Sequence, residues 1–105
     1  MNVDMNELVG LIRQWGVDKG LTGANGKATV EGQLDKLDEE FQELEDGVMV
    51  GDRAETIDAV GDMTVVLILL CELLEMRFED CVQSAYNVIK NRTGKMVAGV
   101  FVKNS

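Results

Sequence analysis

Histidine and proline are both absent from this sequence of 105 residues. Without histidine, the chain has no Ser-His or Cys-His nucleophile, no histidine-ligated zinc site and no histidine general base. The lack of proline suits a chain built mainly of helices. The two cysteines, Cys71 and Cys81, do not have the CxxC spacing of a redox or zinc motif. We therefore expect reduced thiols and a cytoplasmic protein.

The sequence also lacks a long hydrophobic run and an export signal. Its N-terminal segment, MNVDMNELVG, carries acids where a signal peptide carries bases. The longest apolar stretch, Met63 to Leu74, contains Glu72 and is shorter than the ~20 residues that span a bilayer. We therefore expect no membrane partner. We interpret this stretch as the buried helix of a single domain that covers residues 1–105.

Basic residues are scarce and unevenly placed. The chain has 19 acids and 10 bases, and its net charge of −9 disfavours direct binding to nucleic-acid phosphates. All 19 acids lie in the first 80 residues, which hold 6 bases and so carry a net charge of −13. Residues 81–105 hold four bases and no acid. This basic segment could pack on its own acidic domain or hold an anionic ligand.

Hydrophobic spacing predicts four helices and an all-α, four-helix bundle-like fold. The expected helices run from a cap at Asn2 or Asp4 to about Val17, from a cap at Thr29 to about Val50, from about Arg53 to Met76, and from Glu79-Asp80 to about Gly94. A glycine-rich loop separates the first two. The last residues, 95–105, are expected to form a short strand or an ordered tail.

Two groups of carboxylates are the candidates for chemistry. The second expected helix carries Glu39-Glu40-x-x-Glu43 beside an apolar stripe that comprises Leu34, Leu37, Phe41, Leu44 and Val48. At 100° per residue, Glu40 lies about 70° from the centre of that stripe, Glu43 lies about 130° from it, and Glu39 points away. This projection places Glu40 at the border of the buried face.

The second group, Glu55, Asp58 and Asp62, lies within about 60° on the third expected helix, at the start of its apolar run. Burying an unpaired carboxylate costs several kcal/mol, which a divalent cation can offset. Carboxylates from two facing helices make an oxygen site that suits Mg²⁺ when phosphates and water complete its shell. Gly61 costs ~1 kcal/mol in a helix and favours a close approach by a ligand or another backbone. The alternative is an ordinary solvated acidic face.

The order of these motifs resembles that of the MazG-like, all-α nucleoside triphosphate pyrophosphohydrolases, over roughly residues 28–92. The family's EExxE corresponds to residues 39–43, and its ExxD corresponds to residues 59–62, which run directly into the apolar MTVVLILL. Asn87-x-x-Lys90 is similar to a downstream NxxK-type element. The closing segment, 92–103, is similar to small phage and prophage members. The clear departure is Ala59, which stands where the family has glutamate.

The resemblance implies a hydrolase that uses Mg²⁺, with Mn²⁺ as a substitute. It would cut a nucleoside triphosphate between the α and β phosphorus, as in nucleotide-pool house-cleaning. It implies Glu40, Glu43 and Asp62 as catalytic metal ligands and Glu39 as a further motif residue. Asp58 is our hypothesis for the missing fourth ligand. The alternative is a register one turn earlier, in which Glu55-x-x-Asp58 is the ExxD.

The substrate contacts implied by the resemblance are Asn87 and Lys90, which would meet phosphate or sugar. Arg92 and Lys95 are candidates by charge, although a solvated helix end also favours bases. Trp15 could stack on a nucleobase, although its spacing is more typical of a core residue. The all-round apolar third helix predicts self-association, and the resemblance implies a homodimer or homotetramer.

Two other interpretations stay open. The first is an acidic helical binding module, either an inhibitor or a DNA mimic, whose acids would spread outward over the surface. The second is a degenerate family member that binds nucleotide or metal without turnover, which the alanine at position 59 keeps open. Convergence of the two carboxylate groups distinguishes a metal site from a mimic.

Overall fold

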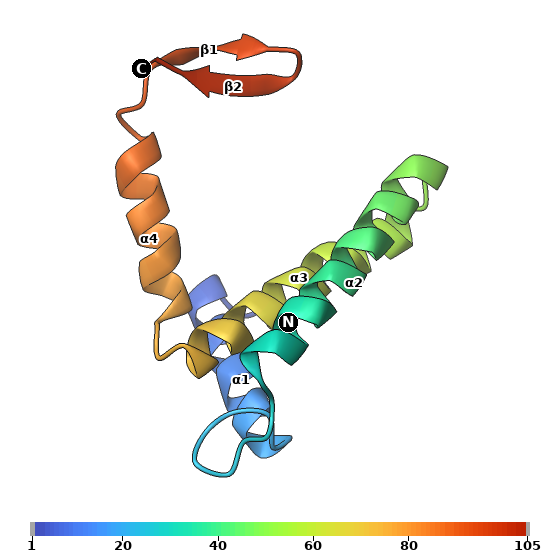
Figure 1. Ribbon diagram of the computed structural model, residues 1–105, viewed down its shortest axis with the longest axis vertical. Helices are drawn as coiled ribbons and strands as arrows, with labels where there is room; N and C mark the ends of the chain where they lie inside the picture. Colours follow the sequence, from blue (N-terminus) through green and yellow to red (C-terminus); the bar gives the residue numbers. More distant parts are fainter. Residues whose placement is uncertain (1, 105) are drawn as a thin grey trace.

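The computed structural model describes residues 2–104. They form four helices and a C-terminal antiparallel hairpin (Figure 1): α1 Met5–Asp18, α2 Val30–Val50, α3 Arg53–Leu73, α4 Phe78–Ile89, β1 Gly94–Val97 and β2 Val100–Lys103. A mostly helical chain with a short extended C-terminal segment is therefore confirmed. No helix within residues 2–104 has the length and apolar character needed to cross a membrane.

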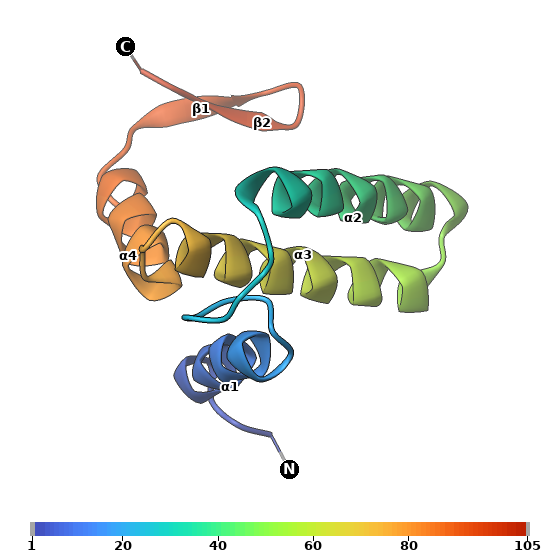
Figure 2. The same ribbon diagram turned by 60° about the horizontal axis from the view of Figure 1, so that its bottom comes forward.

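α2 and α3 run side by side as a helical hairpin (Figure 2). Each begins at a capped residue, because Thr29 Oγ1 accepts a hydrogen bond from the Gly32 N–H and Asp52 Oδ1 accepts one from the Glu55 N–H, both at 3.0 Å. Gly47 allows α3 to approach closely, since a Cβ there would lie 3.1 Å from the Thr56 backbone nitrogen. The pairing therefore depends on a small residue near the end of α2.

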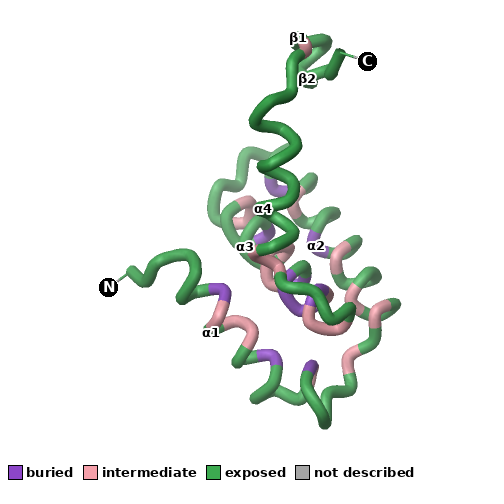
Figure 3. Tube along the Cα trace, turned by 90° about the vertical axis from the view of Figure 1, so that its left-hand side faces the viewer, coloured by how far each residue is buried: buried purple, intermediate pink, exposed green. Residues whose placement is uncertain are grey.

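The core lies along α3, where it meets α1 and α2 (Figure 3). Its buried side chains come mainly from α3: Ala59, Val66, Ile68, Leu69 and Cys71, together with Val9 of α1. α1 crosses the second half of α3 at Gly16, where a Cβ would come within 2.5 Å of Leu69 Cδ2. The expectation that the long apolar run forms the buried helix is confirmed.

α2 buries a different face from the apolar stripe that the sequence predicted. Glu40 and Gly47 are buried, whereas Leu34, Phe41 and Val48 are 46%, 49% and 61% exposed. The close approach at Gly47 moves the line of contact toward this small residue and toward Glu40, which lies about two turns earlier on the same face. Glu40 therefore lies near the centre of the face that meets α3, and its predicted place at the border was wrong.

α4 and the hairpin form an arm, residues 78–103, that diverges from the α2–α3 pair (Figure 1). From Asp80 to Lys90, every residue in the structure is exposed (Figure 3). Arg13 holds the base of the arm, since its Nε donates to Glu72 Oε2 at 2.9 Å and its Nη2 donates to Glu79 Oε1. Within one chain, α4 therefore does not lie alongside α2 and α3 to close a four-helix bundle.

Two boundaries near the C-terminus differ from the prediction. α3 ends at Leu73, three residues early, because Glu75 takes a left-handed conformation with φ 56°. α4 ends at Ile89, and Gly94 instead pairs with Lys103 in the hairpin. The hairpin turns at Ala98-Gly99, whose φ values of 49° and 82° suit a two-residue turn of the type favoured between antiparallel strands.

Candidate metal centre and adjoining pocket

Three of the predicted carboxylates meet between α2 and α3. Glu40, Glu43 and Asp62 each offer one oxygen, and these oxygens lie within 4.8 Å of one another. Glu40 is 4% exposed on the face of α2 that meets α3, while Glu43 and Asp62 are open to solvent. Acids from both sequence motifs therefore converge on one place, as the metal-site hypothesis requires.

The buried carboxylate of Glu40 is only half satisfied. Its Oε1 lies 3.4 Å from Lys36 Nζ, which also pairs with Glu39 Oε2 at 3.3 Å. Its Oε2 is buried and has no hydrogen-bond partner among residues 2–104. Leaving a buried polar atom unsatisfied costs about 1–3 kcal/mol, and more for a charged group. A cation at the cluster would offset the charge of this buried carboxylate.

The surroundings raise the pKa of two of the three carboxyl groups. Burial, the negative charge of Glu40 and then that of Asp58 raise the pKa of Asp62. The adjacent Glu40 raises the pKa of Glu43, first because the two carboxyl groups can share a proton and then by like-charge repulsion. Lys36 opposes both shifts more weakly. The cluster therefore favours a proton or a cation over three free negative charges.

The predicted fourth ligand, Asp58, is not one of the three converging acids. It lines a groove between α1 and α3, although its charge reaches Asp62. Glu55 lies on the side of α3 that meets α2, where its Cγ would be 3.1 Å from a Cβ at position 47. Its charge also contributes to the raised pKa of Glu43. The structure thus makes Glu55 a candidate fourth carboxylate, which its position about 20° from Asp62 in projection could have indicated.

A cavity of about 740 Å³ opens beside the carboxylate cluster. Its lining includes Glu40 and Asp62 together with Lys27, Lys36 and Trp15. Trp15 is 45% exposed, so it forms part of the cavity wall and is not the core residue that its spacing suggested. The volume lies within the ~300–1,000 Å³ typical of small-molecule sites.

The other predicted contact residues lie elsewhere. The arm contains all four of them, Asn87, Lys90, Arg92 and Lys95, and it leads away from the cluster (Figure 1). Asn87 accepts a hydrogen bond from its neighbour Gln83, and Lys90 Nζ lies 6.0 Å from the Tyr86 ring centroid. One chain alone therefore does not bring these four residues to the acids.

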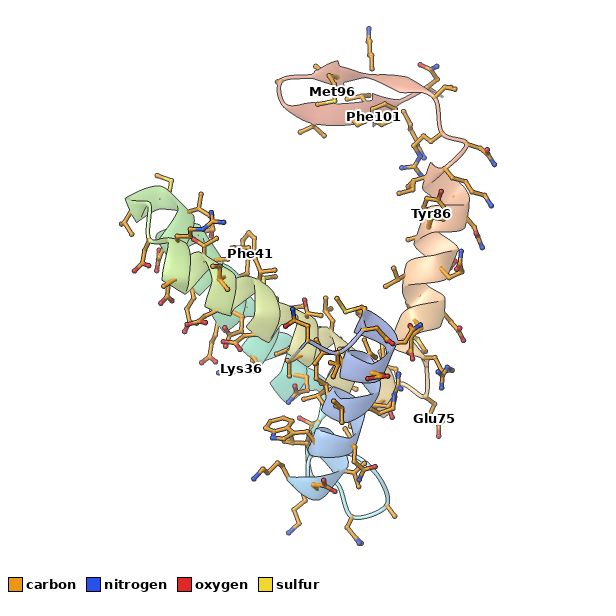
Figure 4. All side chains as sticks on the ribbon, turned by 180° about the vertical axis from the view of Figure 1, so that it is seen from behind. Lys36, Phe41, Glu75, Tyr86, Met96 and Phe101 are labelled. Atoms are coloured by element: carbon orange, nitrogen blue, oxygen red, sulfur yellow. The ribbon has the colours of Figure 1, made fainter. Side chains whose placement is uncertain are left out.

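Glu39 and Lys36 complete the description of the site. The Glu39 side chain is 66% exposed and lies outside the converging group, where it pairs with Lys36. Sequence reasoning missed Lys36, although its spacing of three and four residues from Glu39 and Glu40 indicates ion pairs on a helix. Figure 4 shows Lys36 and Phe41 on opposite sides of the α2–α3 pair.

The arrangement combines hard oxygen ligands with two lysines and an aromatic ring around one cavity. Such a set can hold a divalent cation and a phosphorylated molecule that has a flat ring. Comparisons of this chain with protein-family models, with curated proteins and with solved structures found no match.

Proposed function

We propose that this protein is a MazG-like, Mg²⁺-dependent pyrophosphohydrolase that converts a nucleoside triphosphate into its monophosphate and pyrophosphate. One observation carries the proposal: the buried, unpartnered Oε2 of Glu40 lies in a group of acids that borders a cavity of about 740 Å³. An acidic mimic that presents its charge to a partner has no use for a carboxylate buried in this way. The convergence of Glu43 and Asp62 on the same point supports a metal site.

The three carboxylates fit a Mg²⁺ ion. Mg²⁺ takes oxygen ligands at 2.0–2.1 Å in octahedral geometry, so opposite ligands lie about 4.2 Å apart. The cluster oxygens already lie within 4.8 Å of one another, and the exposed side chains of Glu43 and Asp62 are free to adjust. Water and phosphate oxygens would fill the remaining positions. Mn²⁺ accepts the same ligands.

A bound ion would supply charge neutralisation for the phosphates and a more acidic water molecule. The exposed carboxylate of Glu43 could hold the ion directly or through a water molecule, and in the second case it is placed to accept that water's proton. Lys36 and Lys27 line the cavity and can hold phosphate oxygens. Trp15 offers its ring to the nucleobase. The same chain thereby provides groups for each part of a nucleotide.

A second candidate function is a degenerate relative that binds nucleotide and metal without turnover. It is favoured by Ala59, which occupies the position of the family glutamate and is 1% exposed. Nucleotide binding without product would identify this case. Glu55, one turn earlier, is the acid that could compensate for the missing ligand.

The decisive test is a panel of nucleoside and deoxynucleoside triphosphates with Mg²⁺, Mn²⁺ or EDTA. We expect monophosphate and pyrophosphate, separated by ion-exchange chromatography and identified by ³¹P NMR. Glu43→Gln should lower turnover at least about 100-fold, the usual scale for a proton-transfer group. The matched control is Asp35→Asn, an exposed acid of the same helix that should keep full turnover. Release of orthophosphate together with a nucleoside diphosphate would contradict the proposed reaction.

A further inference from the structure

The arm exposes an apolar stripe that a lone chain would normally bury. On α4, Val82, Tyr86 and Ile89 share one face at helical spacing and are 53%, 55% and 53% exposed. The hairpin exposes five more apolar side chains, from 45% to 64%: Met96, Val97, Val100, Phe101 and Val102. An isolated two-stranded hairpin is at best marginally stable in water. Another surface must therefore cover the arm.

The whole chain exposes more surface than a compact monomer of its size. Its accessible surface is 7915 Å², whereas a folded monomer of 11.5 kDa exposes about 5,800 Å². Its radius of gyration is 16.2 Å, against about 13 Å for a compact domain of this length. The excess is about 2,100 Å² per chain. Two copies that hid it would bury about 4,200 Å² in total, within the range of stable homodimers.

α2 carries a surface complementary to the arm. Leu34, Phe41 and Val48 recur every seven residues on one exposed face, and Asp38 and Glu45 lie on the same face within about 80°. This surface is therefore apolar with acids interspersed. In the chain from residue 81 onward, the charged residues are all bases. Opposite charges beside matching apolar stripes favour association in one register.

The arm cannot readily fold back on α2 of its own chain, because two features hold it away. Arg13 ties Glu79 at the base of α4 to Glu72 of α3, and Glu75 fixes the bend between these helices. Figure 4 shows Phe41 on the α2–α3 pair, well separated from Tyr86, Met96 and Phe101 of the arm. A second molecule is needed to bring the two surfaces together.

We propose that the arm of one copy lies along α2 of a second copy, and that the exchange is reciprocal in a two-fold homodimer. The α4 stripe and the hairpin then cover the row of Leu34, Phe41 and Val48. The lysine and arginine side chains of the arm then face Asp38 and Glu45. This interface does not depend on the proposed hydrolase activity, because it is argued from apolar area and charge alone.

The first experiment is sedimentation equilibrium of the full chain with a matched pair of variants. We expect a dimer at 10 µM, and Tyr86→Asp should raise its dissociation constant at least about 100-fold, because a charge would enter the apolar interface. The control is Ser84→Asp, which adds the same charge on the polar side of α4 and should leave the dimer intact. A wild-type monomer at 100 µM would overturn the proposal, as would equal weakening by the two variants.

The second experiment keeps the test valid if Tyr86→Asp does not fold. Unlabelled and ¹⁵N-labelled wild-type chains are mixed, exchanged and treated with a carbodiimide that joins lysine to a nearby carboxylate. We expect mixed-isotope peptides that join Lys90, Lys95 or Lys103 to Asp38 or Glu45. Links confined to single chains, or dimer links that omit the arm, would refute the exchanged arrangement.

Discussion

Binding of a divalent ion at the carboxylate cluster should stabilise the fold, and this stabilisation should shrink as the pH falls. The pKa values of Glu43 and Asp62 are raised in the folded chain, so folding favours their protonated forms. In metal-free protein, the stability therefore falls as the pH rises through these raised values, and it is regained as the pH falls toward the ordinary carboxyl range near 4. A cation competes with the same protons. Its effect should be largest at pH 7–8 and weakest near pH 5.

The size of the effect follows from the number of ligands. Three carboxylates without a bound phosphate make a weak site, for which a Kd of about 1 mM is a reasonable scale. At 10 mM Mg²⁺, an ion that binds only the folded chain then contributes about 1.4 kcal/mol. For a domain of this length, 1 kcal/mol corresponds to about 4–8 °C in Tm. The expected rise is therefore about 6–11 °C.

The assay is a set of thermal melts, followed by circular dichroism, at pH 5, 6, 7 and 8 in EDTA, Mg²⁺ or Mn²⁺. Glu40→Gln should keep or raise the Tm in EDTA, because it removes a buried charge, and it should reduce the Mg²⁺ shift to about 1–2 °C or less. Glu39→Gln is the matched control, since it also removes a partner of Lys36 but lies outside the cluster. It should retain the full shift.

Two results would refute the metal site. The first is a wild-type Tm at pH 8 that neither Mg²⁺ nor Mn²⁺ changes. The second is a Glu40→Gln variant that responds to Mg²⁺ as strongly as the wild type does. A shift that grew as the pH fell would also contradict the direction assigned to the pKa changes of Glu43 and Asp62.

Further predictions concern the cavity, the core and the arm. Trp15→Ala should raise the KM for a nucleotide about 5- to 150-fold, the scale of one lost base-stacking contact, and nucleotide binding should change the fluorescence of this single tryptophan. Ala59→Glu should lower the free energy of unfolding by about 1–3 kcal/mol in urea titrations, because that position is 1% exposed. Arg13→Gln should speed hydrogen exchange of the α4 amides, since it loses both ion pairs at the base of the arm. In folded protein, a thiol reagent should modify Cys81 and spare Cys71, because Cys71 is buried and burial raises its pKa to about 11.

The sequence predicted well those features that depend on local chemistry. Thr29 and Asp52 cap their helices, and the apolar run of α3 forms the core, because capping residues and hydrophobic length act within a few residues. The meeting of Glu40 and Glu43 with Asp62 was expected from the order of the two motifs, although the helical projection alone placed Glu43 about 130° from the buried face.

Features set by packing between helices could not be derived in the same way. The rotation of α2 about its own axis decides that Glu40 is buried. This rotation depends on the close approach at Gly47, which the hydrophobic periodicity does not show. The place of Trp15 on a cavity wall depends on where the loop after α1 lies. The hairpin was an exception, because Ala98-Gly99 between alternating residues is a recognisable turn signal that was interpreted only as a strand or tail.

The chain changes direction at the left-handed Glu75, and the position of the whole arm depends on this bend. A residue other than glycine in this conformation carries a local cost of roughly 1–2 kcal/mol, and the ion pairs of Arg13 with Glu72 and Glu79 help to hold the bend in place. The 12 residues of α4 extend about 18 Å beyond it, and a rotation of roughly 20° there would sweep the far end through about 6 Å. Small changes at one backbone position can thus redirect everything downstream. Evolution could retune how copies of the chain meet without altering a single residue of the acidic cluster.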